Sequence, residues 1–163
     1  MMLVIAMSIL PATAFGQIEW KDRYVTLAEN DQRNHSIALP TREGYTVVVW
    51  EDYRNGTDSA DIYAQKIDNT TGIAQWFPID GVPVCTVVGV KRNPRAAYDS
   101  LGGVIIVWED FRRTEGPFDD STVCEIYAHR LAVSTGGLTQ AWSNVSDGVP
   151  VCAGTGSIAR RPR

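Results

Sequence analysis

The sequence predicts an all-β protein built from repeated four-stranded antiparallel units, and three observations support this prediction. Three blocks of residues occur twice in the same order. The segments between them contain short runs of β-branched and aromatic residues, which favour strands. No segment after residue 16 shows a helical period of 3.6 residues. Repetition on this scale is typical of solenoids, propellers and arrays.

The repeated blocks align the two halves of the chain with each other. The matched pairs are Trp50–Arg54 with Trp108–Arg112, Ile62–Ala64 with Ile126–Ala128, and Asp80–Cys85 with Asp147–Cys152. Their offsets are 58, 64 and 67 residues. The offset grows along the chain, so the second copy carries longer loops than the first, such as Arg113–Val123.

Each unit is expected to contain four short strands. Buried strands read as continuous apolar runs, and half-buried strands alternate apolar with polar residues. The expected strands are, in order, Ser36–Leu39 and Arg95–Tyr98, Tyr45–Trp50 and Val104–Trp108, Asp61–Ile67 and Glu125–Leu131, and a last strand that carries Trp76 or Trp142 and ends at Cys85 or Cys152. Glycine-containing turns separate these strands.

Four antiparallel strands joined by tight turns form the blade of a β-propeller. We therefore expect about two complete blades, with repeat 1 over residues 35–93 and repeat 2 over residues 94–157. Partial blades are expected at both ends: the last strand of a preceding blade over residues 17–34, and the start of a third blade over residues 158–163. A β-sandwich is the competing architecture, but it would not explain the repetition.

Two blades cannot close a ring, because propellers contain roughly four to eight. Three explanations remain open. The chain is a fragment of a longer repeat protein, or several copies close one ring, or copies join head-to-tail into a filament.

The beginning of the chain resembles a secretory signal peptide over residues 1–16. Met1–Leu10 is apolar, and Ala14 and Gly16 are small residues that suit cleavage before Gln17. A buried strand is the alternative interpretation. The net charge of −4 and the isoelectric point near 5.1 argue against general nucleic-acid binding, which needs a basic face. We therefore expect a secreted or cell-surface protein that contacts neither nucleic acid nor, after cleavage, a membrane.

Taken together, the motifs W-E-D-[YF]-R, [DE]-I-Y-A and D-G-V-P-V-C resemble repeats of large secreted bacterial proteins. Those repeats are regarded as β-propeller blades and often accompany sorting or adhesion modules. The resemblance covers nearly everything after Gln17. It implies a fold rather than an activity, because propellers host many functions. No catalytic residue set transfers from it, and the sialidase-type motif S-x-D-x-G-x-T-W does not occur.

Paired acids followed by an arginine recur in each unit. A glycosidase needs two carboxylates that flank one bond. Here the acids occupy equivalent places in both units, so no single catalytic centre is indicated. We expect each aspartate to stabilise a loop through charge-assisted hydrogen bonds to the arginine, with the tryptophan packed between blades. This structural set is Trp50, Asp52, Arg54, Trp108, Asp110 and Arg112.

Exposed aromatic rings can stack on sugars, which makes four residues weak candidates for a glycan platform. They are Tyr53, Phe111, Trp76 and Trp142. Packing within or between blades is the alternative role for each of them. Oxygen-rich loops can also hold calcium. The acids before the third strands match neither an EF-hand nor a glycine-rich calcium repeat, so no cofactor is expected and calcium is the alternative. These acids are Asp58, Asp61, Asp119, Asp120 and Glu125.

The three cysteines predict one disulfide. When residues are counted outward from a turn near Gly137, Cys124 falls opposite Cys152. The first-unit partner of Cys85 is Ala60, so Cys85 stays single. Closing the loop would contribute about 3–4 kcal/mol on the chain-entropy estimate. Three buried free thiols are the alternative.

These observations favour a secreted, non-catalytic protein with an extracellular structural or assembly role. Its expected partners are copies of itself, joined through open edge strands into oligomers or filaments. A glycan-binding adhesion module is the first alternative, with extracellular polysaccharide as its partner. A fragment of a larger propeller enzyme, such as a glycosidase, is the second.

Overall fold

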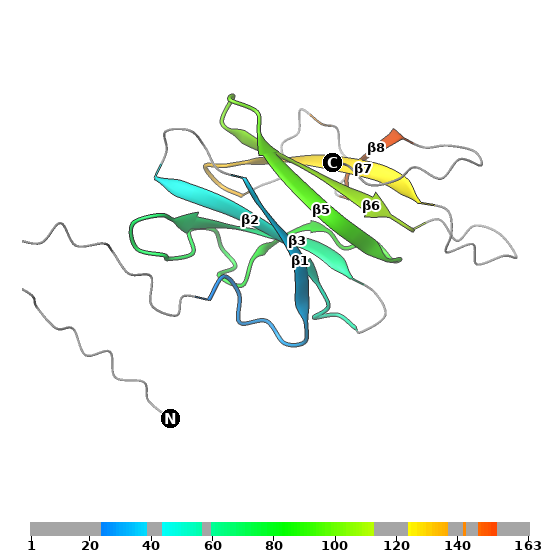
Figure 1. Cartoon of the computed structure of the whole chain (residues 1–163), viewed down its shortest axis with the longest axis horizontal. Helices are drawn as coiled ribbons and strands as arrows, with labels where there is room; N and C mark the ends of the chain where they lie inside the picture. Colours follow the sequence, from blue (N-terminus) through cyan, green and yellow to red (C-terminus); the bar gives the residue numbers. More distant parts are fainter. Residues whose placement is uncertain are drawn as a thin grey trace, which may run out of the picture.

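The computed structural model describes residues 24–38, 44–56, 60–112, 124–136, 142 and 147–152. Within them the chain forms two antiparallel four-stranded sheets (Figure 1). The first sheet contains β1 (Gln32–Ala38), β2 (Tyr45–Asp52), β3 (Asp61–Asp68) and β4 (Val82–Cys85). The second contains β5 (Lys91–Tyr98), β6 (Gly103–Asp110), β7 (Glu125–Ala132) and β8 (Val149–Cys152). The predicted all-β class, with two sets of four strands, is confirmed.

Strand order follows the sequence in both sheets, so each strand pairs with the next one along the chain. The registers are also matched: Trp50 lies opposite Tyr63 in the first sheet, and Trp108 lies opposite Tyr127 in the second. No helix in the described part of the chain is long and apolar enough to span a bilayer.

Both first strands begin earlier than the sequence predicts. Instead of starting near Ser36 and Arg95, they start at Gln32 and Lys91. An irregularity interrupts the pairing of β1 with β2 and of β5 with β6 at matched places. In each case it contains an asparagine with positive φ, which is 48° at Asn34 and 53° at Asn93. Asparagine adopts this left-handed conformation more readily than most residues, so it suits a bulge.

The sheets therefore divide the chain between Cys85 and Lys91. The expected unit boundaries at residues 34/35 and 93/94 fall inside β1 and β5. The strand expected to carry Trp76 is also shorter than predicted, since Trp76 lies outside β4. Around Trp142, residues 137–141 and 143–146 lie outside the described part of the chain, and β8 is described from Val149. The expected signal peptide (1–16) and the expected start of a third unit (158–163) lie outside the described residues.

The two sheets share one hydrophobic core. The first strand of the second sheet, β5, packs against β1 and β2 of the first sheet, and Figure 1 shows it running beside them. Valine and isoleucine side chains from β2 and β6 meet in this core, together with the indoles of Trp76 and Trp108. Burying such side chains contributes about 1.5–3 kcal/mol each.

The two sheets bury opposite faces of matched strands. Val49 of β2 is fully buried, whereas its counterpart in β6, Val107, is half-buried. The next residue behaves the other way, because Val48 is half-buried and its counterpart Ile106 is fully buried. Side chains alternate between the faces of a strand. Each sheet thus buries one face against the other sheet and keeps its second face open. The open face carries Val48 in the first sheet and Val107 in the second, so the two open faces do not correspond to each other in the repeat.

Candidate functional site

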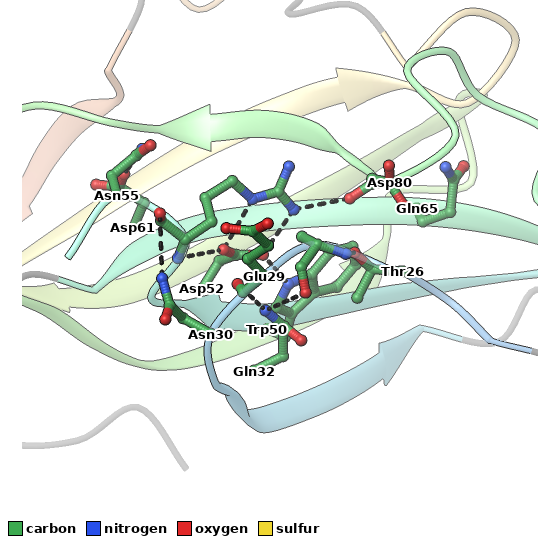
Figure 2. Close-up of polar contacts among 12 residues, drawn as sticks. Thr26, Glu29, Asn30, Gln32, Trp50, Asp52, Asn55, Asp61, Gln65 and Asp80 are labelled. Carbon is green, nitrogen blue, oxygen red and sulfur yellow. Dashed lines mark hydrogen bonds and ion pairs between the residues drawn. The ribbon is translucent and has the colours of Figure 1, made fainter. Parts of the chain in front are cut away.

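A polar cluster that contains Trp50 and Asp52 lies at the end of β2 (Figure 2), and Arg54 joins its members. The indole Nε1 of Trp50 donates a 2.7 Å hydrogen bond to Asp52 Oδ2, since both side chains lie on one face of the strand. Arg54 donates to both oxygens of the same carboxylate, at 2.8 Å from Nε and 2.7 Å from Nη2. Its backbone N–H adds a 2.9 Å bond to Oδ1. The Asp52 side chain is fully buried, whereas that of Arg54 is 20% exposed, so the carboxylate of this bidentate pair is shielded from water.

The same guanidinium reaches beyond β2 and fixes the turn before β4. Arg54 Nη2 donates to the carbonyl of Asp80 at 2.8 Å. The guanidinium carbon lies 3.9 Å from the centroid of the Tyr63 ring, a cation–π distance. Gly81 follows with φ of 103°, and its backbone lies against the Trp50 indole. The cluster therefore joins β2, β3 and the turn before β4.

Two opposing effects act on the pKa of Asp52. Burial raises the pKa, but hydrogen bonds from Arg54 and from the Trp50 indole outweigh this, so the pKa lies below its ordinary value of 3.8. The pKa of Arg54 is raised, chiefly by its hydrogen bond to Asp52 and against the effect of burial. Both groups are ionised at neutral pH, which suits a structural pair rather than an acid–base catalyst.

The second sheet repeats this cluster with its own residues. Trp108 Nε1 donates to Asp110 Oδ2 at 2.7 Å, and Arg112 Nη2 donates to the same oxygen at 2.6 Å. Arg112 also donates to the carbonyl of Asp147 at 2.8 Å and lies 3.8 Å from the Tyr127 ring centroid. The residues expected to form the structural set thus lie together in two matched clusters.

The acid before each aspartate has a different role, which the sequence did not indicate. Glu51 is 1% exposed and accepts a 2.8 Å hydrogen bond from Asn34 Nδ2 within its own sheet. The same oxygen, Oε1, accepts a 2.7 Å bond from the backbone N–H of Asn93 in the second sheet. Glu109, the counterpart of Glu51, accepts a 2.7 Å bond from Asn93 Nδ2. Glu51 therefore links the two sheets through a main-chain amide.

A buried ion pair forms a second link between the sheets. Lys91 Nζ lies 2.9 Å from Asp61 Oδ1, with the lysine side chain fully buried. The ammonium also donates to the carbonyl of Val87, and the backbone N–H of Lys91 donates to the carbonyl of Ala60 at 3.1 Å. Asn55 Nδ2 donates to the other carboxylate oxygen of Asp61 at 2.8 Å. The pair is thus supported by hydrogen bonds, as a buried charge requires.

The aromatic candidates for a glycan platform occupy different surroundings. Trp76 is 4% exposed and donates from Nε1 to the carbonyl of Val133 in the second sheet at 3.0 Å, so it packs between the sheets and is not open to a sugar. Tyr53 and Phe111 are half-buried, and Arg33 and Arg92 lie 5.0 Å and 5.6 Å from their ring centroids. Trp142, the counterpart of Trp76, is half-buried.

The structure differs from the expected disulfide between Cys124 and Cys152. Cys152 lies opposite Ile126, and the register shifts between Ile126 and Tyr127, so counting from the turn misses the partner by two residues. Cys85, Cys124 and Cys152 all carry free thiols. Burial raises the pKa of Cys85 to about 12 and that of Cys124 to about 11.

Metal-ligating residues do not gather in the described part of the chain: no three of its His, Cys, Asp and Glu side chains converge as a site would require. Of the loop acids considered for calcium, Asp61 is engaged by Lys91 and Asn55. Asp58, Asp119 and Asp120 lie outside the described residues.

A cavity of about 660 Å³ lies on the open face of the first sheet. Its floor is formed by side chains of β1, such as the exposed His35 and Ile37, and by side chains of β2, such as the half-buried Val48, and residues 24–26 form one wall. The lining includes Tyr24, Val25, His35, Ile37, Val48 and Trp50. On the second sheet, the residues that match this floor are covered by the first sheet.

Comparisons with protein-family models, with curated proteins and with solved structures found no match to this chain.

Proposed function

We propose that this chain is a secreted, non-catalytic structural protein whose propeller-type units stack on further units of the same kind. Each four-stranded sheet would act as one blade. The biological role would be assembly, with repetition building an oligomer or filament that presents rigid loops.

One observation carries this proposal: matched strands are covered unequally. In β4, Val84 and Cys85 are each 1% exposed and belong to the core that the two sheets share, and Arg112, which follows β6, donates to Cys85 Sγ at 3.3 Å. In β8, the counterpart Val151 is 62% exposed and Cys152 is exposed. Identical sequence motifs are thus buried in the first sheet and exposed in the second. Exposed apolar positions of this kind mark interaction surfaces.

The hydrogen bonds of the two matched clusters support the same proposal, because they make each unit rigid. In each sheet the arginine of the W-E-D-[YF]-R motif fixes the turn before the last strand, through Asp80 in one case and Asp147 in the other. A unit held in this way presents a defined face to its neighbour. Preorganised surfaces bind with a smaller entropic cost.

The test is the assembly state of the purified chain, measured by light scattering with negative-stain imaging of the same sample. Discrete rings or regular filaments are the expected outcome. A protein that remains monomeric at every accessible concentration would overturn the proposed assembly role.

A further inference from the structure

We infer that two copies of this chain associate face to face, with the open face of the second sheet of one copy on the open face of the first sheet of the next. This inference rests on the proposed assembly function and names its contact surface. The occupant of each face is a second copy of the chain, because the chain's own sheet–sheet interface already shows both halves of such a contact.

The internal interface supplies the template. The first sheet contributes Val47, Val49 and Glu51 from β2, each at most 1% exposed. The second contributes Val104 and Ile106 from β6, both fully buried. The outward positions carry the matching sets: Ile105, Val107 and Glu109 on the second sheet, and Thr46, Val48 and Trp50 on the first. Of these, Thr46, Val48, Ile105 and Val107 are half-buried, whereas Trp50 and Glu109 are 3% and 7% exposed. One copy therefore carries each half of the interface on the face that its own second sheet does not cover.

The proposed contact includes a hydrogen bond to a carboxylate, that of Glu109, analogous to the bond that Glu51 accepts in the internal interface. Glu51 accepts one bond from Asn34 Nδ2 and one from the backbone N–H of Asn93 in the second sheet. The Glu109 carboxylate accepts a bond from Asn93 Nδ2, as that of Glu51 does from Asn34 Nδ2, and this is the one hydrogen bond of the Glu109 side chain within the described residues. In the stacked pair, the backbone N–H of Asn34 in the next copy is placed to donate a hydrogen bond to the Glu109 carboxylate, as the backbone N–H of Asn93 donates to Glu51. A charge-assisted bond of this kind is also directional.

Residues 24–26 occupy the place that an incoming β8 would take. The backbone N–H of Leu27 donates to Asp80 Oδ1 at 2.8 Å, and that of Thr86 donates to Asp147 Oδ1 at 3.1 Å. The segment before Leu27 thus sits on the first sheet as β4 sits on the second. Tyr24 and Leu27 are 71% and 72% exposed, so few contacts hold this segment. Stacking displaces residues 24–26 of the next copy, and β8 of the first copy replaces them, which buries Val151 and Cys152.

The contact uses two different faces, so it can be tested by complementation. Val107→Arg places a charge on one face and Val48→Arg places the same charge on the other; both side chains are half-buried at present. Each variant alone should be monomeric. An equimolar mixture should give discrete dimers, because each variant keeps the face that the other lacks. Leu101→Arg is the matched control: it adds the same charge at an 84% exposed turn residue and should assemble like the unmodified chain.

Assembly is measured by sedimentation velocity, and folding of each variant by circular dichroism and thermal melting. A variant that fails to fold is replaced by aspartate at the same position. Glu109→Ala should weaken association about tenfold, the loss expected for one charged hydrogen bond. Dimers in the mixture, with Cys152 newly protected from alkylation, support the inference.

The other outcomes overturn it in distinguishable ways. Unchanged assembly by Val48→Arg or Val107→Arg, or a mixture that stays monomeric, would eliminate face-to-face stacking but leave the assembly role standing. An unmodified chain that never associates removes both.

Discussion

At the scale of single residues, the Trp-Glu-Asp motif separates three roles that look alike in the sequence. The tryptophan and the aspartate share one face of β2, and Asp52 holds Arg54. The glutamate between them points to the other face, where Glu51 meets the second sheet. Strand alternation explains this division. The role of the aspartate was predictable from the nearby arginine, whereas that of the glutamate was not, because its partner lies 42 residues away.

The low pKa of Asp52 predicts a specific acid sensitivity. A carboxyl whose pKa is lowered on folding stabilises the protein above its ordinary pKa of 3.8, and this stabilisation is lost as the pH falls through the folded-state value. Asp52→Asn should therefore lower stability at pH 7 by about 1.5–3 kcal/mol, since Arg54 and the Trp50 indole lose a charged hydrogen-bond acceptor, and the loss should shrink below pH 4.

Urea unfolding from pH 7 to pH 2 measures this effect. Asp31→Asn is the control, because Asp31 also pairs with an arginine, Arg33, but both side chains are largely exposed. Exposed pairs contribute at most about 1 kcal/mol. Equal losses for the two variants would contradict a buried role for Asp52.

The thiols should differ in reactivity because alkylation requires the thiolate. Burial holds the pKa of Cys85 near 12 and that of Cys124 near 11. At pH 8 and low protein concentration, iodoacetamide should modify the exposed Cys152 first. Cys85 and Cys124 should react only after denaturation. Mass spectrometry of the intact and digested chain shows the order in which the three cysteines are alkylated. Rapid labelling of Cys85 in the folded state would contradict its burial.

At the scale of elements, the central strands followed from composition, but both first strands and the outer register did not. β2 and β6 end in a repeated motif after β-branched runs. β1 and β5 begin with polar residues and contain a bulge at Asn34 or Asn93, so no apolar alternation marks their start. The recurrence of Arg-Asn in both was the available signal. The shift beside Ile126 is likewise invisible to a count from the turn.

The turn before β4 predicts a measurable steric effect. A Cβ at Gly81 would lie 2.6 Å from the Trp50 ring, at φ of 103°. Gly81→Ala should cost about 1 kcal/mol for the backbone conformation and about 1–3 kcal/mol more for the clash. Gly102→Ala is the matched control, since Gly102 has φ of 79° with no atom within 4 Å of the added carbon. Chemical denaturation compares the two; equal losses would show that the indole moves aside.

At the scale of the whole molecule, the joint between the two sheets depends on contacts that no local pattern predicts. Lys91 and Asp61 are 30 residues apart in sequence and meet in the core. Lys91→Met should destabilise the protein by about 3–5 kcal/mol, because Asp61 then keeps an uncompensated buried charge.

The companion variant, Lys91→Met with Asp61→Asn, should recover most of this loss. Thermal unfolding of both variants measures it. If Lys91→Met alone lowers the stability no more than the double variant does, water already compensates the charge of Asp61.

The link from Glu51 to the backbone at Asn93 also bears on how such a chain can change over evolutionary time. A carboxylate that recognises a main-chain amide does not depend on the side chain of its partner. Any residue except proline supplies the same donor. The position that matches Asn93 near the end of the sequence is Arg161, which retains an amide. The bond to Glu51 can therefore be inherited when the side chain changes, whereas the bond from Asn93 Nδ2 to Glu109 and the left-handed backbone at Asn93 both favour asparagine.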